Sequence, residues 1–201
     1  MTKTLLKRIL VTSAIAVLGV STSFAALVIE RDEGLDTAPS VGMYRYQVPT
    51  ELQNAYNSAS VANLTASMEK EPNTLSMNVA HVKGNPSESY VVEIYKDLAA
   101  IDTHRKSDHY QAFINEVGSK LTNRKMYDVQ SVVLFEKKDA LSIVNDGKAV
   151  VTLTEFTVNS NDIDTVQRQY QLDIERAVRD DAGYKAGYVL RERNAKNRWY
   201  V

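Results

Sequence analysis

Two of the chain's three histidines, His104 and His109, lie in the stretch EIYKDLAAIDTHRKSDH at residues 93–109, among acids, a tyrosine and a lysine. An imidazole changes protonation near neutral pH, so it can serve as a general base or as a metal ligand. Histidine pairs that bind a metal from one helix are four residues apart. On a continuous helix these two, five apart, would point about 140° away from each other. We therefore expect no metal site here, although a helix break at residues 105–107 would leave a site of His104, His109 and Asp108 open.

The elements that must position these residues can be read from the spacing of apolar side chains. Alternating patterns predict four strands and helical spacing predicts the helices between them. Thr50 with Gln53 has the spacing of a capping box, Asp97 is expected to cap a short helix, and Ser107 a second one. The expected strands are residues 41–48, 74–82, 89–95 and 126–136; the expected helices are one over 50–70, a short one after Asp97, and a second after Ser107 and Asp108 that buries Tyr110, Val117 and Leu121. The order β-α-β-β-α-β predicts an α+β fold of the ferredoxin-like type, an antiparallel sheet with helices on one face.

The pattern then begins again. With one constant offset and no gap, Val41 falls on Val151, Leu64 on Ile174 and Tyr90 on Tyr200. Strand ends, caps and apolar positions coincide, so we expect a tandem repeat. The second copy has no counterpart of residues 92–136 and is expected to be incomplete.

The N-terminus has the three parts of a secretory signal: Lys3, Lys7 and Arg8, then an apolar run from Ile9 to Val20, then small residues up to Ala25. The apolar run is too short to span a membrane. We expect cleavage after Ala25 and a soluble periplasmic or secreted protein. The sequence is thus divided into a signal peptide (1–25), a linker (26–40), a first domain (41–136), a linker (137–147) and a second, incomplete domain (148–201).

Composition excludes several classes of function. Removing the leader takes away three cations and no anion, which changes the formal net charge from −1 to −4. A mildly acidic surface argues against a nucleic-acid partner. The chain has no cysteine, so it has no disulfide, no thiolate nucleophile and no thiolate metal ligand.

The first copy resembles the antibiotic biosynthesis monooxygenase superfamily. The resemblance rests on Glu71-Pro72-Asn73 after the first helix, on Glu93-Ile94-Tyr95 at the end of the third strand, and on Thr103-His104 with Asp108-His109. It implies a dimeric α+β barrel, in which two four-stranded sheets face each other. Here the barrel is expected to form from a homodimer or from the two copies as an intrachain pseudo-dimer.

The resemblance also implies a chemistry. Family members oxygenate quinols or polycyclic phenols without metal or flavin, because the ionised substrate itself gives an electron to dioxygen. Such a reaction needs a base, polar groups that hold the oxyanion, and an apolar pocket. The expected bases are His104 and His81, which shares a strand face with Leu75, Met77 and Val79 that we expect to point into the barrel. The expected substrate-binding residues are Tyr44, Tyr46, Tyr95 and His109.

The sequence thus favours an exported monooxygenase that needs no cofactor and acts on a small aromatic or quinol-like molecule. The alternative is a non-catalytic periplasmic ligand-binding or assembly module on the same fold. Glu93 is interpreted as a surface partner for a helix lysine or arginine. Haem degradation is not favoured, because the first strand has no asparagine and the first copy no tryptophan.

Overall fold

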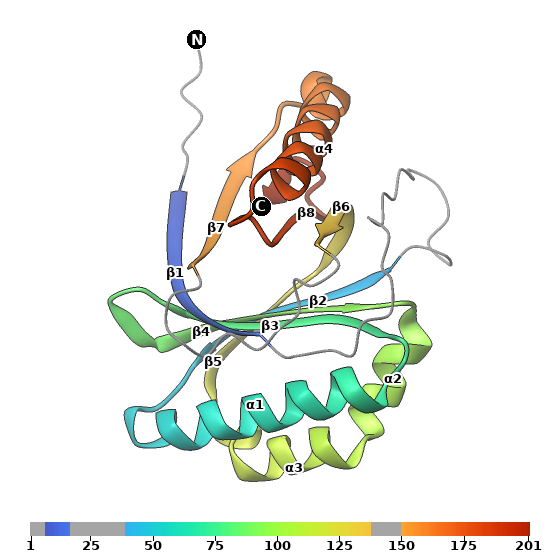
Figure 1. Ribbon diagram of the computed structural model, residues 1–201. Helices are drawn as coiled ribbons and strands as arrows, with labels where there is room; N and C mark the ends of the chain where they lie inside the picture. The colour runs from blue at the N-terminus through green and yellow to red at the C-terminus, as the bar shows by residue number, and fades with distance from the viewer. Residues whose placement is uncertain (1–6, 17–38, 138–149) are drawn as a thin grey trace.

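A computed structural model describes residues 7–16, 39–137 and 150–201 (Figure 1). The predicted linkers at 26–40 and 137–147 lie almost wholly outside these residues, as does the predicted signal peptide apart from Lys7–Ala16. No helix in the described part of the chain is both long and apolar enough to cross a membrane.

The first half of the chain is an antiparallel four-stranded sheet with helices on one face. In space the strands follow the order β5-β2-β4-β3, and α1, α2 and α3 cover the face below the sheet in Figure 1. The strands are β2 (Ser40–Gln47), β3 (Thr74–Val82), β4 (Asn85–Tyr95) and β5 (Thr122–Tyr127), and the helices are α1 (Gln53–Lys70), α2 (Leu98–Lys106) and α3 (Asp108–Glu116). The α+β, ferredoxin-like fold class predicted from the sequence is therefore confirmed.

The second half repeats this plan over fewer elements. It consists of β7 (Val150–Thr157), α4 (Ile163–Asp180), β8 (Ala186–Glu192) and β9 (Arg198–Tyr200). The offset that aligns Val41 with Val151 also carries both ends of β2 onto those of β7, and both ends of α1 onto those of α4. Trp199 and Phe156 are buried between this sheet and α4.

The two halves share one core and one continuous sheet. The strand order is β5-β2-β4-β3-β1-β7-β9-β8-β6, with β1 (Lys7–Ala16) between the halves and β6 (Val129–Glu136) at the far edge. The sheet folds over itself, so that Met43 and Ile94 of the first half pack with Leu190 and Tyr200 of the second. Burial of this apolar layer stabilises the association of the two halves, with a free energy of about 25 cal/mol for each Å² of apolar surface removed from water.

Two local predictions need correction. Residues 126–136, expected to be one strand, divide at Asp128: β5 pairs with β2, whereas β6 crosses to the second half and pairs with β8. Thr50 forms no capping box with Gln53, because the chain enters α1 through a single 3₁₀ turn (Thr50–Leu52) without a side-chain cap.

The two other predicted caps are present. The Asp97 carboxylate accepts a hydrogen bond from the Ala100 amide (2.9 Å), and the Ser107 hydroxyl accepts one from the Tyr110 amide (3.3 Å). Each satisfies an amide that has no partner within its own helix. Ser107, with ψ of 148°, ends α2 and begins α3. Helix direction therefore changes between the two histidines.

Candidate active site

A cavity of about 300 Å³ lies between the first-half sheet and the three helices. Its walls are mainly aromatic and aliphatic, and its polar groups gather near the C-terminal ends of β4 and α2. The lining residues that matter for its chemistry are Tyr44, Tyr46, Asn63, Glu93, Tyr95, His104, Arg105 and Tyr110. A small, largely apolar cavity with a few convergent polar groups is the usual form of a small-molecule site.

His104 lines this cavity and is almost completely buried, with 1% of its surface exposed. Its Nδ1 lies 3.1 and 3.2 Å from the two carboxylate oxygens of Glu71. Because an ionised carboxylate can only accept, Nδ1 carries the hydrogen and neutral His104 has its lone pair on Nε2. Nε2 is buried and has no hydrogen-bond partner among the described residues. The geometry therefore presents a base whose orientation is fixed by a carboxylate, the arrangement that activates histidine in hydrolase triads.

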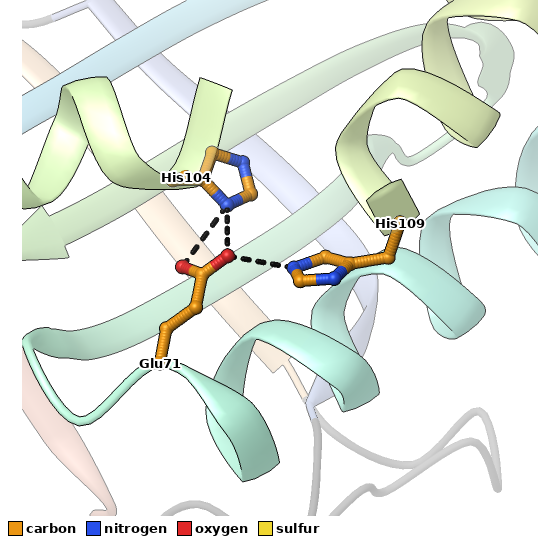
Figure 2. A group of neighbouring side chains, drawn as sticks. All are labelled: Glu71, His104 and His109. Atoms are coloured by element: carbon orange, nitrogen blue, oxygen red, sulfur yellow. Dashed lines mark hydrogen bonds and ion pairs between the residues drawn. The ribbon is translucent and has the colours of Figure 1, made fainter. Parts of the chain in front are cut away.

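His109 reaches the same carboxylate from the other helix. Its Nε2–H donates to Glu71 Oε1 at 2.7 Å. Figure 2 shows the two rings meeting at Glu71 from separate helices, α2 and α3, with the second ring nitrogen of His104 turned away from the carboxylate. The break at Ser107 makes this convergence possible. His109, expected to bind substrate, does not line the cavity; it holds Glu71.

Glu71 is the hub of this network, and only 8% of its surface is exposed. It also accepts a hydrogen bond from the Thr74 hydroxyl at 2.6 Å. Burial by itself raises the pKa of the Glu71 carboxyl, but the hydrogen bonds from His104 and Thr74 outweigh burial and lower the pKa below its usual value. The carboxylate is therefore ionised at neutral pH.

This lowered pKa makes a prediction about acid stability. A carboxyl whose pKa is lower in the folded state contributes stability above its unfolded pKa, about 4.5, and loses it as the pH falls through the folded pKa. We expect the free energy of unfolding to fall more steeply below about pH 4.5 in the wild type than in Glu71→Gln. Urea unfolding at a series of pH values measures both slopes. Parallel curves for the two proteins would contradict this account of Glu71.

Glu93 is the second acid of the site. It is half-buried and lines the cavity, and it accepts a hydrogen bond from the Tyr95 hydroxyl at 3.0 Å. Burial raises the pKa of the Glu93 carboxyl, although nearby His104 and the Tyr95 hydrogen bond act in the opposite direction. Its interpretation as a surface ion pair is therefore wrong. The pKa values of Glu71 and Glu93 are therefore shifted in opposite directions, because hydrogen bonds dominate at Glu71 and burial dominates at Glu93.

The predicted tyrosines are in the cavity wall. Tyr44 and Tyr46 stack with ring centroids 6.0 Å apart, and Tyr95 packs against His104 at 5.6 Å. Arg105 also lines the cavity, and the nearby Tyr44 hydroxyl raises the pKa of its guanidinium, which places a cation beside the cavity. Gly42 gives Tyr44 its room, because a Cβ at this position would lie 2.7 Å from the tyrosine ring.

His81 lies elsewhere. A β-bulge between Thr74 and Ser76 breaks the alternation of β3, so Leu75 faces the core between the two halves whereas Met77 and Val79 face the helices. His81 is at the helix side of the far end of β3, with Nε2 2.8 Å from Asn57 Oδ1 and Nδ1 3.0 Å from the Pro86 carbonyl. The expectation that this face points into the barrel is wrong, and both nitrogens of His81 are occupied outside the cavity.

The only group of three or more potential ligands within the described residues is formed by Glu71, His104 and His109, whose ligand atoms all lie within 4.8 Å of one another. Two histidines and one carboxylate are a known ligand set for non-haem iron. The short contacts of Glu71 with His104, His109 and Thr74 are, however, those of a complete set of charge-assisted hydrogen bonds. We therefore treat the three residues as a hydrogen-bonded network.

Sequence reasoning missed Glu71, Asn63 and Arg105 as site residues. Asn63 Oδ1 is buried on the cavity wall without a hydrogen-bond partner in the described part of the chain. Glu71 belonged to the Glu-Pro-Asn motif that carried the resemblance, and that motif was the one signal that pointed to it.

Comparison with known proteins agrees with the fold. Residues 41–116 match the family model described as antibiotic biosynthesis monooxygenase. No curated protein sequence matches the chain.

Two solved structures resemble most of the described fold. One is a proposed monooxygenase from Lactobacillus acidophilus NCFM, with 16% identity, a TM-score of 0.71, and coverage of 81% of this chain and 74% of that one. Another is a proposed monooxygenase from Fusobacterium nucleatum, with 21% identity, a TM-score of 0.63, and coverage of 82% and 74%. At these identities the likeness concerns the fold. The segment that matches this family model includes Glu71, Glu93, His104 and His109, and the match agrees with the resemblance seen in the sequence.

Proposed function

We propose that the protein is a monooxygenase that uses no cofactor and acts on a small phenol or quinol bound in the first-half cavity. The observation that carries this proposal is His104: its Nδ1–H is held by Glu71, and its unpartnered Nε2 belongs to a residue of the cavity wall. A phenol O–H directed at Nε2 would give up its proton there. The imidazolium that forms is stabilised by the Glu71 carboxylate.

The remaining steps follow from the chemistry of the ionised substrate. The phenolate gives one electron to dioxygen, and the two radicals combine at a ring carbon to form a hydroperoxide. Loss of water from the hydroperoxide leaves a quinone, so that phenol and dioxygen become quinone and water. Arg105 lies where it can stabilise the phenolate oxygen, and Glu93, with its raised pKa, can supply the proton that leaves with water.

Oxygen uptake with a panel of one-ring to three-ring phenols and quinols tests this proposal. We expect uptake above the uncatalysed rate for at least one small fused-ring phenol, with one quinone formed for each dioxygen consumed. Uptake should not require added metal, and prior dialysis against a chelator should leave it unchanged. If chelation abolishes uptake and iron restores it, the three-residue ligand group becomes the better account of the site.

A non-catalytic ligand-binding module is the second candidate, because the same cavity would hold a small aromatic molecule without reacting with it. The two candidates predict different results with the same panel. A binding module gives saturable quenching or calorimetric heat without oxygen uptake.

We further propose that the two halves are tandem copies of one unit that form an intrachain pseudo-dimer. The single offset that relates β2 to β7 and α1 to α4 supports this. The resemblance to the antibiotic biosynthesis monooxygenase family, in which a dimer forms the barrel, also supports it. Export remains a proposal that rests on the composition of residues 1–25, and intact-mass measurement of the protein from a periplasmic extract tests it.

A further inference from the structure

The strand β1 lies beside β7 of the second half, in the position that β5 occupies beside β2 in the first half. Within the second half, β7 has β9 on one side and β1 on the other, and β1 also pairs with β3 of the first half. In Figure 1 the blue β1 runs beside β7 and reaches the sheet at β3. One extended segment therefore bridges the two halves on this side.

On the opposite side of the molecule the bridge is made by residues 122–136. β5 pairs with β2, the chain passes Asp128, and β6 pairs with β8 of the second half. By the repeat offset, β7 is the counterpart of β2 and β8 is the counterpart of β3. Residues 122–136 join β2 of the first half to β8 of the second, and β1 joins β7 of the second half to β3 of the first.

The registers of the two bridges coincide once the repeat offset is applied. In the first half, the strand β5 pairs with β2 so that Lys125 lies opposite Arg45 and Tyr127 lies opposite Met43. In the second half, β1 pairs with β7 so that Lys7 lies opposite Glu155 and Ile9 lies opposite Leu153. Glu155 and Leu153 are the repeat counterparts of Arg45 and Met43. The strand β6 pairs with β8 so that Val129 lies opposite Glu192 and Val133 lies opposite Val189. The strand β1 pairs with β3 so that Val11 lies opposite Val82 and Ile15 lies opposite Val79. Val82 and Val79 are the repeat counterparts of Glu192 and Val189.

One constant shift therefore relates β1 to the bridge at 122–136. It carries Lys7 onto Lys125 at one end and Ile15 onto Val133 at the other. Each bridge also has its register shift at nearly the same point, between Thr12 and Ala14 and between Ser131 and Val133. The two bridges thus share one register at both ends, although β1 is a single strand and residues 122–136 form two.

We propose that Lys7–Ala16 acts as the fourth strand of the second half. The second half needs a strand between β7 and β3 for the same reason that the first half needs β5–β6: without it, two sheet edges carry unpaired backbone amides and carbonyls. The N-terminal segment fills this slot in the register that the first half defines. Cleavage after Ala25 would separate this strand from the rest of the chain, and loss of the released leader would open a strand-binding slot along β3 and β7.

A cysteine cross-link tests the register in the full chain. The chain has no cysteine, so every disulfide formed is an engineered one. Val11 lies opposite Val151, and directly opposed residues of antiparallel strands are close enough for a disulfide. The full chain should be made by cell-free synthesis without membranes, which keeps the leader, and its mass should be verified.

We expect the pair Val11→Cys and Val151→Cys to oxidise nearly completely under mild conditions. The control pair Lys7→Cys and Val151→Cys should stay reduced, because Lys7 lies opposite Glu155, four residues and about 13 Å away along β7. Equal oxidation of the two pairs, or none in either, would overturn the proposal.

A second experiment tests the consequence of cleavage. The chain lacking residues 1–25 should unfold at a lower temperature than the full chain, and a synthetic peptide of residues 7–16 should bind to it and restore the lost stability by β-strand addition. A peptide of the same composition in scrambled order is the control. The shortened chain could instead dimerise, with a second copy in the slot. If the peptide then separates the dimer, the slot is confirmed, because the peptide and the second copy compete for it. An unchanged melting temperature without peptide binding would overturn the proposal. These measurements do not involve substrate, so they stand or fall separately from the proposed monooxygenase activity.

Discussion

Replacing His104 with glutamine should lower oxygen uptake by about 100-fold to 10⁴-fold, the range typical for loss of a general base. Glutamine is similar in length and its amide can still donate to Glu71, so the network around Glu71 stays largely satisfied. What it cannot do is accept a proton at the position of Nε2. The effect should fall on kcat rather than on KM, because the proton is transferred in the reaction and not on binding. Oxygen-electrode kinetics over a range of substrate concentrations separate the two constants.

His81→Gln is the matched control for this experiment. His81 lies outside the cavity with both ring nitrogens hydrogen-bonded, so the same chemical change there should leave kcat unchanged within about twofold. Equal losses in His104→Gln and His81→Gln would show that neither loss reports on a base. Unchanged uptake in His104→Gln would remove the catalytic assignment.

Replacing Glu71 with glutamine should be almost as damaging to turnover, although Glu71 touches no substrate. Its amide oxygen, in the place of Oε1, can still accept from His109, but its NH₂ group takes the place of Oε2, which lies as close to Nδ1 of His104 as Oε1 does, and so favours the tautomer in which Nδ1 is an acceptor. The ring proton moves to Nε2, and the base is lost through the wrong tautomer. The same acid-to-amide exchange in a serine-protease triad costs about 10⁴-fold, and we expect a loss of about 100-fold to 10⁴-fold here.

Glu71 is a positioning residue, so the test needs a readout that a purely structural role would not move. At neutral pH Glu71→Gln should melt below the wild type only by the small amount that the lowered pKa of Glu71 contributes, since the amide conserves shape and most hydrogen bonds. Glu71→Asp, which keeps the acceptor-only carboxylate, should recover part of kcat. A large loss of stability in Glu71→Gln together with no rescue by Glu71→Asp would assign Glu71 to structure alone.

Much of the fold was within reach of the sequence because it depends on local signals. The alternation in β2, β3 and β4, the helical spacing in α1 and α4, and the caps at Asp97 and Ser107 each act within a few residues. The constant offset in the sequence also predicted the correspondence of β2 with β7 and of α1 with α4, which no single element shows.

The site was less predictable because it is assembled from distant segments. Glu71 precedes His104 and His109 by 33 and 38 positions in the sequence, and no spacing rule connects them. The error at His81 had another cause: both faces of the first-half sheet are apolar, one toward the helices and one toward the second half. Alternation shows which residues share a face of a strand, but it does not show whether that face lies against the helices or against the second half. In β3, a bulge between Thr74 and Ser76 also places Leu75 on the opposite face from Met77 and Val79.

The extended backbone at Ser107 has an evolutionary consequence. Since each added or removed residue turns a helix by about 100°, an insertion or deletion between His104 and His109 that fused α2 with α3 would turn the two rings away from each other. Residues between His104 and His109 can therefore be substituted, whereas a change in their number would separate the two rings. We therefore expect the five-residue spacing of the two histidines to be kept in relatives that keep this network, more strictly than the identity of the residues between them.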